Sequence, residues 1–186
     1  MKYRKQINVI YYFSSVIIFL LSALSHFMYD WTNNNEFISM FVPTNESIFQ
    51  HLKMIFFPIV LYYLVTYIIY NRKYDIIFYK WILSAITTFL FTSALITASY
   101  YIFRTGFNIE SMFIDIVSLI SGLILSSFLC AHLYYRTKIM NVKVCNPIVI
   151  LGLLALVISI SFFDKNPMKV DMFYDNENDT YYSVEK

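Results

Sequence analysis

Two of the three histidines in the chain, His26 and His51, stand on either side of a polar segment that contains Glu46. His26 lies near the end of a long apolar run and His51 just before the next one, which places both imidazoles at the same end of two neighbouring membrane helices. Asp115, near the start of a later apolar run, is expected at the same depth. Neutral imidazoles and carboxylates are the ligands of zinc in many catalytic sites. The sequence therefore predicts that His26, Glu46 and His51 bind one divalent metal ion such as zinc.

A metal ion held by two histidines and one carboxylate keeps a coordination position open for water. The ion activates that water, so the predicted chemistry is metal-assisted hydrolysis of a lipid or a peptide at the membrane surface. Glu46 and Asp115 are the candidate catalytic carboxylates. The residues expected to orient the ligands, or to hold the loop around them, are Tyr29, Asn45, Ser47 and Lys53.

The segment before His51 sets a condition on this site. Its residues are typical of a helix start, with Thr44 or Asn45 as the capping residue. On an ideal helix Glu46 and His51 point about 140° apart, so both can bind one ion only if Glu46 lies in an irregular first turn. His132 is excluded from the site, because it lies seventeen residues beyond Asp115 on the same helix, about 26 Å away.

The elements that must position these residues follow from composition. Of the 186 residues, 59% are hydrophobic and 14% are charged, and the mean hydropathy is +0.58. Soluble domains carry about a quarter charged residues, so lipid must solvate much of this chain. We therefore expect an all-α integral membrane helical bundle of about five transmembrane helices, folded as one domain over residues 1–163. The apolar runs that predict these helices lie at 9–28, 54–70, 81–103, 113–134 and 147–163.

The distribution of charge predicts the orientation of the bundle. Lys and Arg gather before the first apolar run, between the second and third, and between the fourth and fifth, whereas carboxylates gather in the other segments. The positive-inside rule therefore places the N-terminus inside and the C-terminus outside, with the predicted metal site at the outer face. Residues 164–186 form a polar, acidic C-terminal tail, which we expect to be solvated and mobile.

Composition also limits the partners. The net charge of +2 is too small to indicate a nucleic-acid partner. The lipid bilayer is the expected environment, and a membrane protein partner is compatible with so small a chain. Cys130 and Cys145 lack the spacing of metal ligands and are expected to be packing residues on the cytoplasmic side.

The stretch around the predicted site resembles a family of uncharacterised bacterial multi-pass membrane proteins, catalogued as a domain of unknown function. The similarity rests on the first apolar run with His26 and Tyr29, followed by VPTNESIFQHLKMIFFP. The family motif is similar to P-x-N-E-S-x-x-x-H-x-K. The matching residues are Pro43, Asn45, Glu46, Ser47, His51, Lys53 and Pro58. The resemblance implies a location in the bacterial cytoplasmic membrane. It also implies that other members of the family have His and Asp at the positions of His26 and Asp115. It implies no activity.

Two other functions remain open, so the chain is not assigned as an enzyme at this stage. In a non-enzymatic accessory, immunity or partner-binding protein, His26, Asp115 and Lys53 would simply pair while the loop caps a helix. A proton or small-ion transporter could use the Ser and Thr residues of the helices, although the chain lacks the inverted repeats of many transporters. Ser22, His26 and a later Asp also resemble membrane hydrolases related to alkaline ceramidases, but their later H-x-x-x-H motif is missing.

Overall fold

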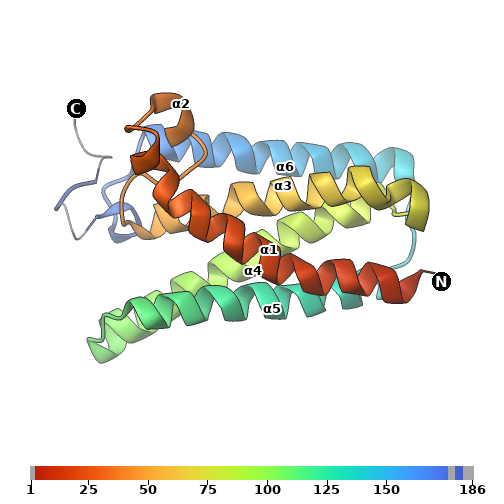
Figure 1. Ribbon diagram of the computed structural model, residues 1–186, viewed down its shortest axis with the longest axis horizontal. Coiled ribbons are helices and arrows are strands. Elements are labelled where there is room, and N and C mark those ends of the chain that lie inside the picture. Colours follow the sequence, from red (N-terminus) through yellow and green to blue (C-terminus); the bar gives the residue numbers. More distant parts are fainter. Residues whose placement is uncertain (1–2, 176–178, 182–186) are drawn as a thin grey trace.

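The computed structural model describes residues 3–175 and 179–181. Lys2 lies outside the described part, as do residues 176–178 and 182–186 of the expected tail. The described residues form six α-helices, one π-helical turn and one short 3-10 helix (Figure 1). In chain order they are α1 (Arg4–Trp31), α2 (Glu36–Ser39), α3 (Ile48–Tyr74), α4 (Phe78–Tyr100), η1 (Tyr101–Gly106), α5 (Met112–Arg136), α6 (Val142–Lys165) and η2 (Asp171–Phe173).

Five of these helices are long and apolar enough to cross a membrane, which confirms the expected number of spans. They are α1, α3, α4 with its π-helical extension, α5 and α6, and each has between 24 and 29 residues. At 1.5 Å per residue, the shortest is about 36 Å long, more than the hydrocarbon thickness of about 30 Å. Each helix contains the apolar run that predicted it and continues into more polar residues.

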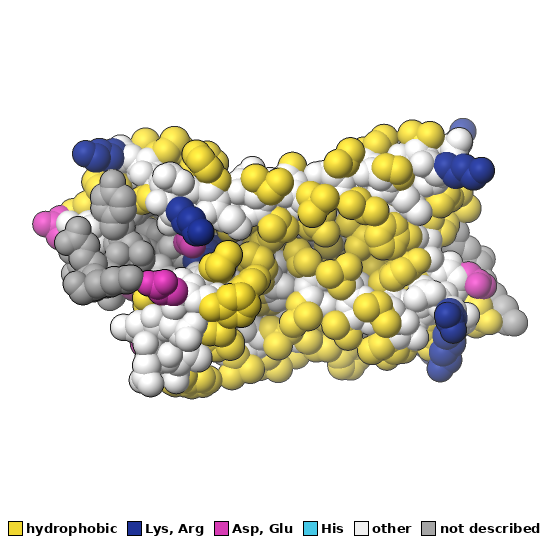
Figure 2. Space-filling model, turned by 90° about the horizontal axis from the view of Figure 1, so that it is seen from above, with side chains coloured by type: hydrophobic (Ala, Val, Ile, Leu, Met, Phe, Trp, Pro, Cys, Tyr) yellow, Lys and Arg dark blue, Asp and Glu magenta, His cyan; other side chains and the backbone are white. Residues whose placement is uncertain are grey.

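The long helices lie roughly lengthwise, and short connections reverse the chain at both ends of the bundle (Figure 1). The end that carries α2, the start of α3 and the end of α6 is called the α2 end. The N-terminal end of α1 lies at the opposite end (Figure 1). Apolar side chains cover the middle of the face shown in Figure 2, and the charged side chains lie toward its two ends. A membrane protein requires this banded surface.

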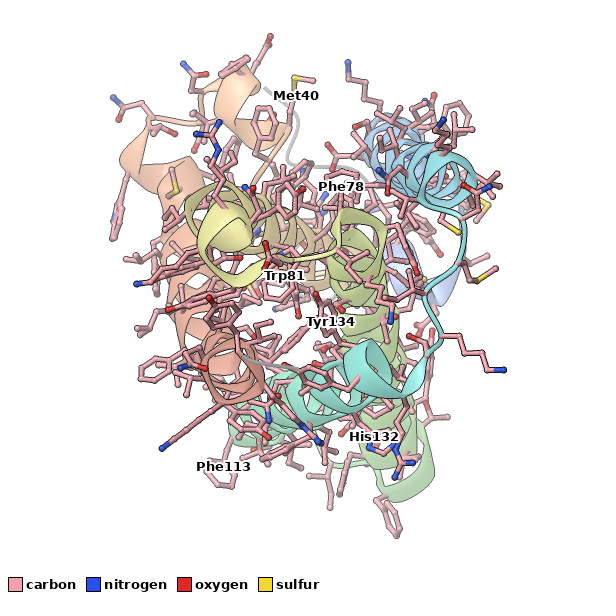
Figure 3. The ribbon with its side chains drawn as sticks, turned by 90° about the vertical axis from the view of Figure 1, so that its right-hand side faces the viewer. Met40, Phe78, Trp81, Phe113, His132 and Tyr134 are labelled. Atoms are coloured by element: carbon pink, nitrogen blue, oxygen red, sulfur yellow. The ribbon has the colours of Figure 1, made fainter. Side chains whose placement is uncertain are left out.

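The core combines large aromatic rings with hydroxyl groups that bond between helices. Trp81 and Tyr134 lie in the middle of the bundle, whereas Phe113 lies at its edge (Figure 3). The Tyr63 hydroxyl is 3.0 Å from the Thr88 hydroxyl, and the Trp81 indole N–H donates to the Tyr63 carbonyl at 2.9 Å. Such bonds tie α3 to α4, because hydrocarbon offers no other partner to a buried hydroxyl.

The helices are buried unequally along the bundle. Toward the α2 end the α4–α5 hairpin diverges from α1, α3 and α6 (Figure 1), and no residue from 94 to 117 is buried. Helix α6 packs against α4 and is peripheral, since only Val149 and Ile160 of its residues are buried. Its remaining apolar face is exposed, as expected for a helix that contacts lipid.

The beginning of the polar tail folds back onto the bundle. Phe173 is buried, with its ring 4.7 Å from that of Phe49 on α3 and 5.9 Å from that of Phe163 on α6. Asp175 and Thr180 form an isolated antiparallel bridge. An apolar anchor inside a polar segment was not apparent from composition, because a single Phe does not alter the average polarity.

Candidate functional site

The loop between α1 and α3 presents Glu46 in front of the first turn of α3. Helix α3 begins at Ile48, and its N-cap is Ser47, whose hydroxyl accepts from the Gln50 N–H at 3.4 Å. The prediction that Thr44 or Asn45 caps this helix is therefore wrong. Asn45 instead accepts the Ser47 N–H at 3.0 Å, which shapes the turn before the cap. Because Glu46 precedes the helix, it satisfies the condition that it lie outside a regular first turn.

The structure brings the three predicted ligands, His26, Glu46 and His51, together at the α2 end. The two oxygens of the Glu46 carboxylate face different imidazoles: Oε1 is 3.6 Å from His26 Nε2, and Oε2 is 3.5 Å from His51 Nε2. The imidazole rings are stacked, with centroids 6.0 Å apart and an interplanar angle of 30°. One carboxylate thus stands between the Nε2 atoms of two neighbouring helices. We call these three residues the His–Glu–His cluster.

The cluster is partly open and incompletely hydrogen-bonded. The side chains of His26, Glu46 and His51 keep 28%, 37% and 34% of their surface exposed. His51 Nδ1 lies 3.0 Å from the Ser47 carbonyl oxygen, which fixes this ring on α3 and leaves Nε2 turned toward Glu46. His26 Nδ1 is buried without a partner among the described residues. Such a buried nitrogen is unusual and marks a place where a further group is needed.

Asp115 forms no ion pair with the residues of the cluster. It is exposed on the first turn of α5, and it interacts electrostatically with both His51 and Arg104. It forms no ion pair with His26 or Lys53 in the described part of the chain, so the pairing suggested for these three residues is wrong. A carboxylate that is near a histidine and unpaired is free to accept a proton or to orient water.

Lys53 has a different partner, Asp164, which sequence reasoning missed. The Lys53 side chain is fully buried, and its ammonium group lies 2.7 Å from the Asp164 carboxylate at the end of α6. The same oxygen of Asp164 accepts from Gln50 Nε2 at 2.8 Å. A lysine next to an apolar run signals that a carboxylate must be close, but nothing in the sequence selects Asp164 from the other candidates.

The remaining candidate residues have mainly structural surroundings. Tyr29 is half-buried near the end of α1, and its carbonyl accepts from the Thr32 hydroxyl at 3.1 Å. His132 is exposed near the end of α5 (Figure 3), at the opposite end of this helix from Asp115. No group of three or more His, Cys, Asp and Glu side chains within residues 3–175 and 179–181 already has the spacing of a metal site.

Comparisons with known proteins give one result. Neither the curated proteins nor the solved structures include a match to this chain. A family model does match, over residues 1–183, and its description is "Family of unknown function (DUF6512)". Since the model covers nearly the whole chain, the protein belongs to this family of unknown function.

Proposed function

We propose that the His–Glu–His cluster binds one divalent metal ion of the zinc type and that the ion serves a hydrolytic reaction at the membrane surface. The observation that carries the proposal is the position of one carboxylate between two Nε2 atoms, at 3.6 and 3.5 Å. These separations are too long for good hydrogen bonds. Ligand atoms around a tetrahedral zinc ion lie about 3.3 Å from one another, so each of these two separations exceeds that value by only a few tenths of an ångström.

Small side-chain movements would complete the site. Two imidazoles on one tetrahedral zinc ion hold their ring centroids about 5 Å apart, against 6.0 Å in this structure. The side chains of His26, Glu46 and His51 are partly exposed, so neighbouring atoms leave room for small rotations of the two imidazoles. Metal ligands commonly close around the ion when it binds, because binding and local folding are coupled. The missing partner of His26 Nδ1 is then a water or a carbonyl that orients the ring.

The chemistry follows from the ligand set. Two histidines and one carboxylate leave a position for water, and the ion makes this water a better nucleophile. An ion held by His26, Glu46 and His51 would activate water toward a carbonyl or phosphoryl centre, and Asp115 is the candidate residue to take up the proton and return it to the leaving group. The exposure of Asp115 and its electrostatic interaction with His51 support this role. The substrates in reach of such a site are lipid headgroups and membrane-proximal peptides at the outer face of the cytoplasmic membrane.

Metal analysis of the purified protein tests the proposal. Wild type prepared without chelators should hold about one equivalent of zinc per chain. The variants His26→Ala, His51→Ala and Glu46→Gln should lose it, whereas His132→Ala, which alters an exposed histidine far from the cluster, should keep it. Added zinc should raise the melting temperature of wild type and of His132→Ala only. Wild type without metal, and without stabilisation by added zinc, would overturn the proposal and favour an accessory or partner-binding protein.

A further inference from the structure

Helix α6 is peripheral, yet Asp164 in its last turn bonds to the first turns of α3, the helix that carries His51. Its described contacts with other helices are mainly with α4, through Val149 and other apolar residues. At the α2 end, however, Asp164 projects into polar surroundings, and only 14% of its side chain is exposed. One polar side chain of a lipid-facing helix therefore reaches the elements that carry the cluster.

The Asp164 carboxylate binds two residues that flank His51 on α3. The ammonium group of Lys53 donates to Asp164 Oδ1 at 2.7 Å, and the Gln50 amide donates to the same oxygen at 2.8 Å. Lys53 is completely buried, so its charge depends on this carboxylate for compensation. His51 lies between these two residues in the sequence. Its backbone is therefore fixed on both sides by Asp164.

The same two residues also hold the loop that carries Glu46. The Lys53 ammonium group donates a second hydrogen bond, to the Ser39 carbonyl oxygen at 2.5 Å, which ties the end of α2 to α3. The Gln50 side-chain oxygen accepts from the Thr44 N–H at 3.4 Å, two residues before Glu46. The loop and the first turn of α3 are thus joined to α6 through a single carboxylate.

From this network we infer that Asp164 is a positioning residue for the His–Glu–His cluster, acting through Lys53 and Gln50. Asp164 touches neither imidazole nor Glu46. It holds the two segments whose relative position sets the distance from Glu46 to His51. Loss of the carboxylate strands the buried Lys53 charge, so the first turn of α3 has to move to hydrate it. This inference goes beyond the proposed metal chemistry but uses it as one of its two readouts.

The zinc affinity of matched variants provides the first readout. Asp164→Ala should weaken zinc binding about tenfold or more, the usual effect of removing a partner behind metal ligands. Asp164→Asn keeps an oxygen for Gln50 and should have a smaller effect, which covers the case in which Asp164→Ala fails to fold. The control is Lys80→Met, which removes a second buried lysine, one that donates to the Tyr134 and Thr137 carbonyls. It should lower thermal stability without changing zinc affinity.

The second readout needs no metal. Diethyl pyrocarbonate modifies accessible imidazoles, and mass spectrometry follows each histidine separately. In the metal-free Asp164→Asn and Asp164→Ala proteins, His26 and His51 should react faster than in wild type, while His132 should react at the same rate. In Lys80→Met, His26 and His51 should react as in wild type. Any local unfolding caused by this substitution should stay near Lys80 and should not reach the α2 end.

The two readouts separate the possible outcomes. If wild type binds no zinc but the Asp164 variants expose His26 and His51, the proposed metal function fails and the positioning role stands. A second outcome is that wild type binds zinc, but the Asp164 variants change zinc affinity and histidine reactivity no more than Lys80→Met does. The positioning role is then overturned while the metal function stands. If wild type binds no zinc and the reactivities do not change, both are wrong.

Discussion

Gly122 lies on the face of α5 that packs against α4, opposite Thr92. A Cβ atom at Gly122 would lie 2.9 Å from Thr92 Cγ2 and 3.2 Å from Thr92 Cα. The first contact could be relieved by a rotation of the Thr92 side chain, but the second involves backbone. Gly122→Ala must therefore move the two helices apart, at a place where small residues allow close approach.

The size of the effect can be estimated against a second glycine. Overpacking a well-packed interior costs about 1–3 kcal/mol. Replacing Gly by Ala inside a helix also gains about 1 kcal/mol of helix propensity, so the proper reference is the same substitution in open surroundings. Gly152 on α6 provides it, because a Cβ there would lie 3.7 Å from Ile86 Cδ1, an ordinary contact. We expect Gly122→Ala to be less stable than Gly152→Ala by about 1–3 kcal/mol.

Equilibrium unfolding in mixed micelles of a mild detergent and SDS measures this difference. Trp81 provides a fluorescence signal, because it is buried with its ring 4.8 Å from that of Tyr11. Thr92→Ala in the Gly122→Ala background should recover part of the loss, since it removes the 2.9 Å contact and leaves the one to Cα. The Thr92 hydroxyl has no partner in the described part of the chain, so its removal sacrifices no bond. Equal stability of Gly122→Ala and Gly152→Ala would refute the close approach of α4 and α5.

Three further predictions concern orientation, the isolated carboxylate and the core. In a cysteine-free background, Asn34→Cys should react with an impermeant thiol reagent in intact cells and Asn141→Cys only after lysis; the reverse pattern would invert the predicted orientation. Asp115→Asn should keep its zinc and change the free energy of unfolding by less than about 0.5 kcal/mol, because Asp115 is exposed; loss of zinc would identify it as a ligand. Tyr63→Phe removes the 3.0 Å bond to Thr88 and should cost about 0.6–1.7 kcal/mol in the same unfolding assay, whereas no loss would show that the bond contributes nothing.

The sequence predicted those features of the site that depend on local helix geometry and on the depth of a residue in the membrane. Glu46 and His51 are five positions apart, and the run of residues around them shows that a helix starts there. His26 lies near the end of the preceding apolar run, so two consecutive antiparallel spans bring it to the same level. The choice of cap failed because Thr44, Asn45 and Ser47 are all residue types that commonly cap helices. Their backbone conformation decides between them, and it depends on contacts with other elements.

The partners of buried charged side chains could not be predicted from local geometry and depth. Lys53 lies at the start of the second apolar run, and burial of its ammonium group requires a carboxylate nearby. Asp115 and Asp164 both lie at the α2 end of long helices, on α5 and α6, so depth alone does not separate them. The choice depends on which helix ends beside the start of α3. The α4–α5 hairpin, which has Asp115 in the first turn of α5, diverges from α3 at this end (Figure 1), whereas Asp164 at the end of α6 lies 2.7 Å from Lys53.

This difference in packing also separates the roles of the two carboxylates. Asp164 is enclosed and binds a fully buried cation, so its charge is already used to hold α3 and the loop in place. Asp115 is exposed and has no ion-pair partner in the described residues, although His51 lies within electrostatic range. A carboxylate already paired with an ammonium group is a poor proton acceptor, whereas an unpaired one near a histidine remains available. Of these two carboxylates, Asp115 is therefore the one available to accept a proton, and the distance from Glu46 to His51 is expected to depend on Asp164.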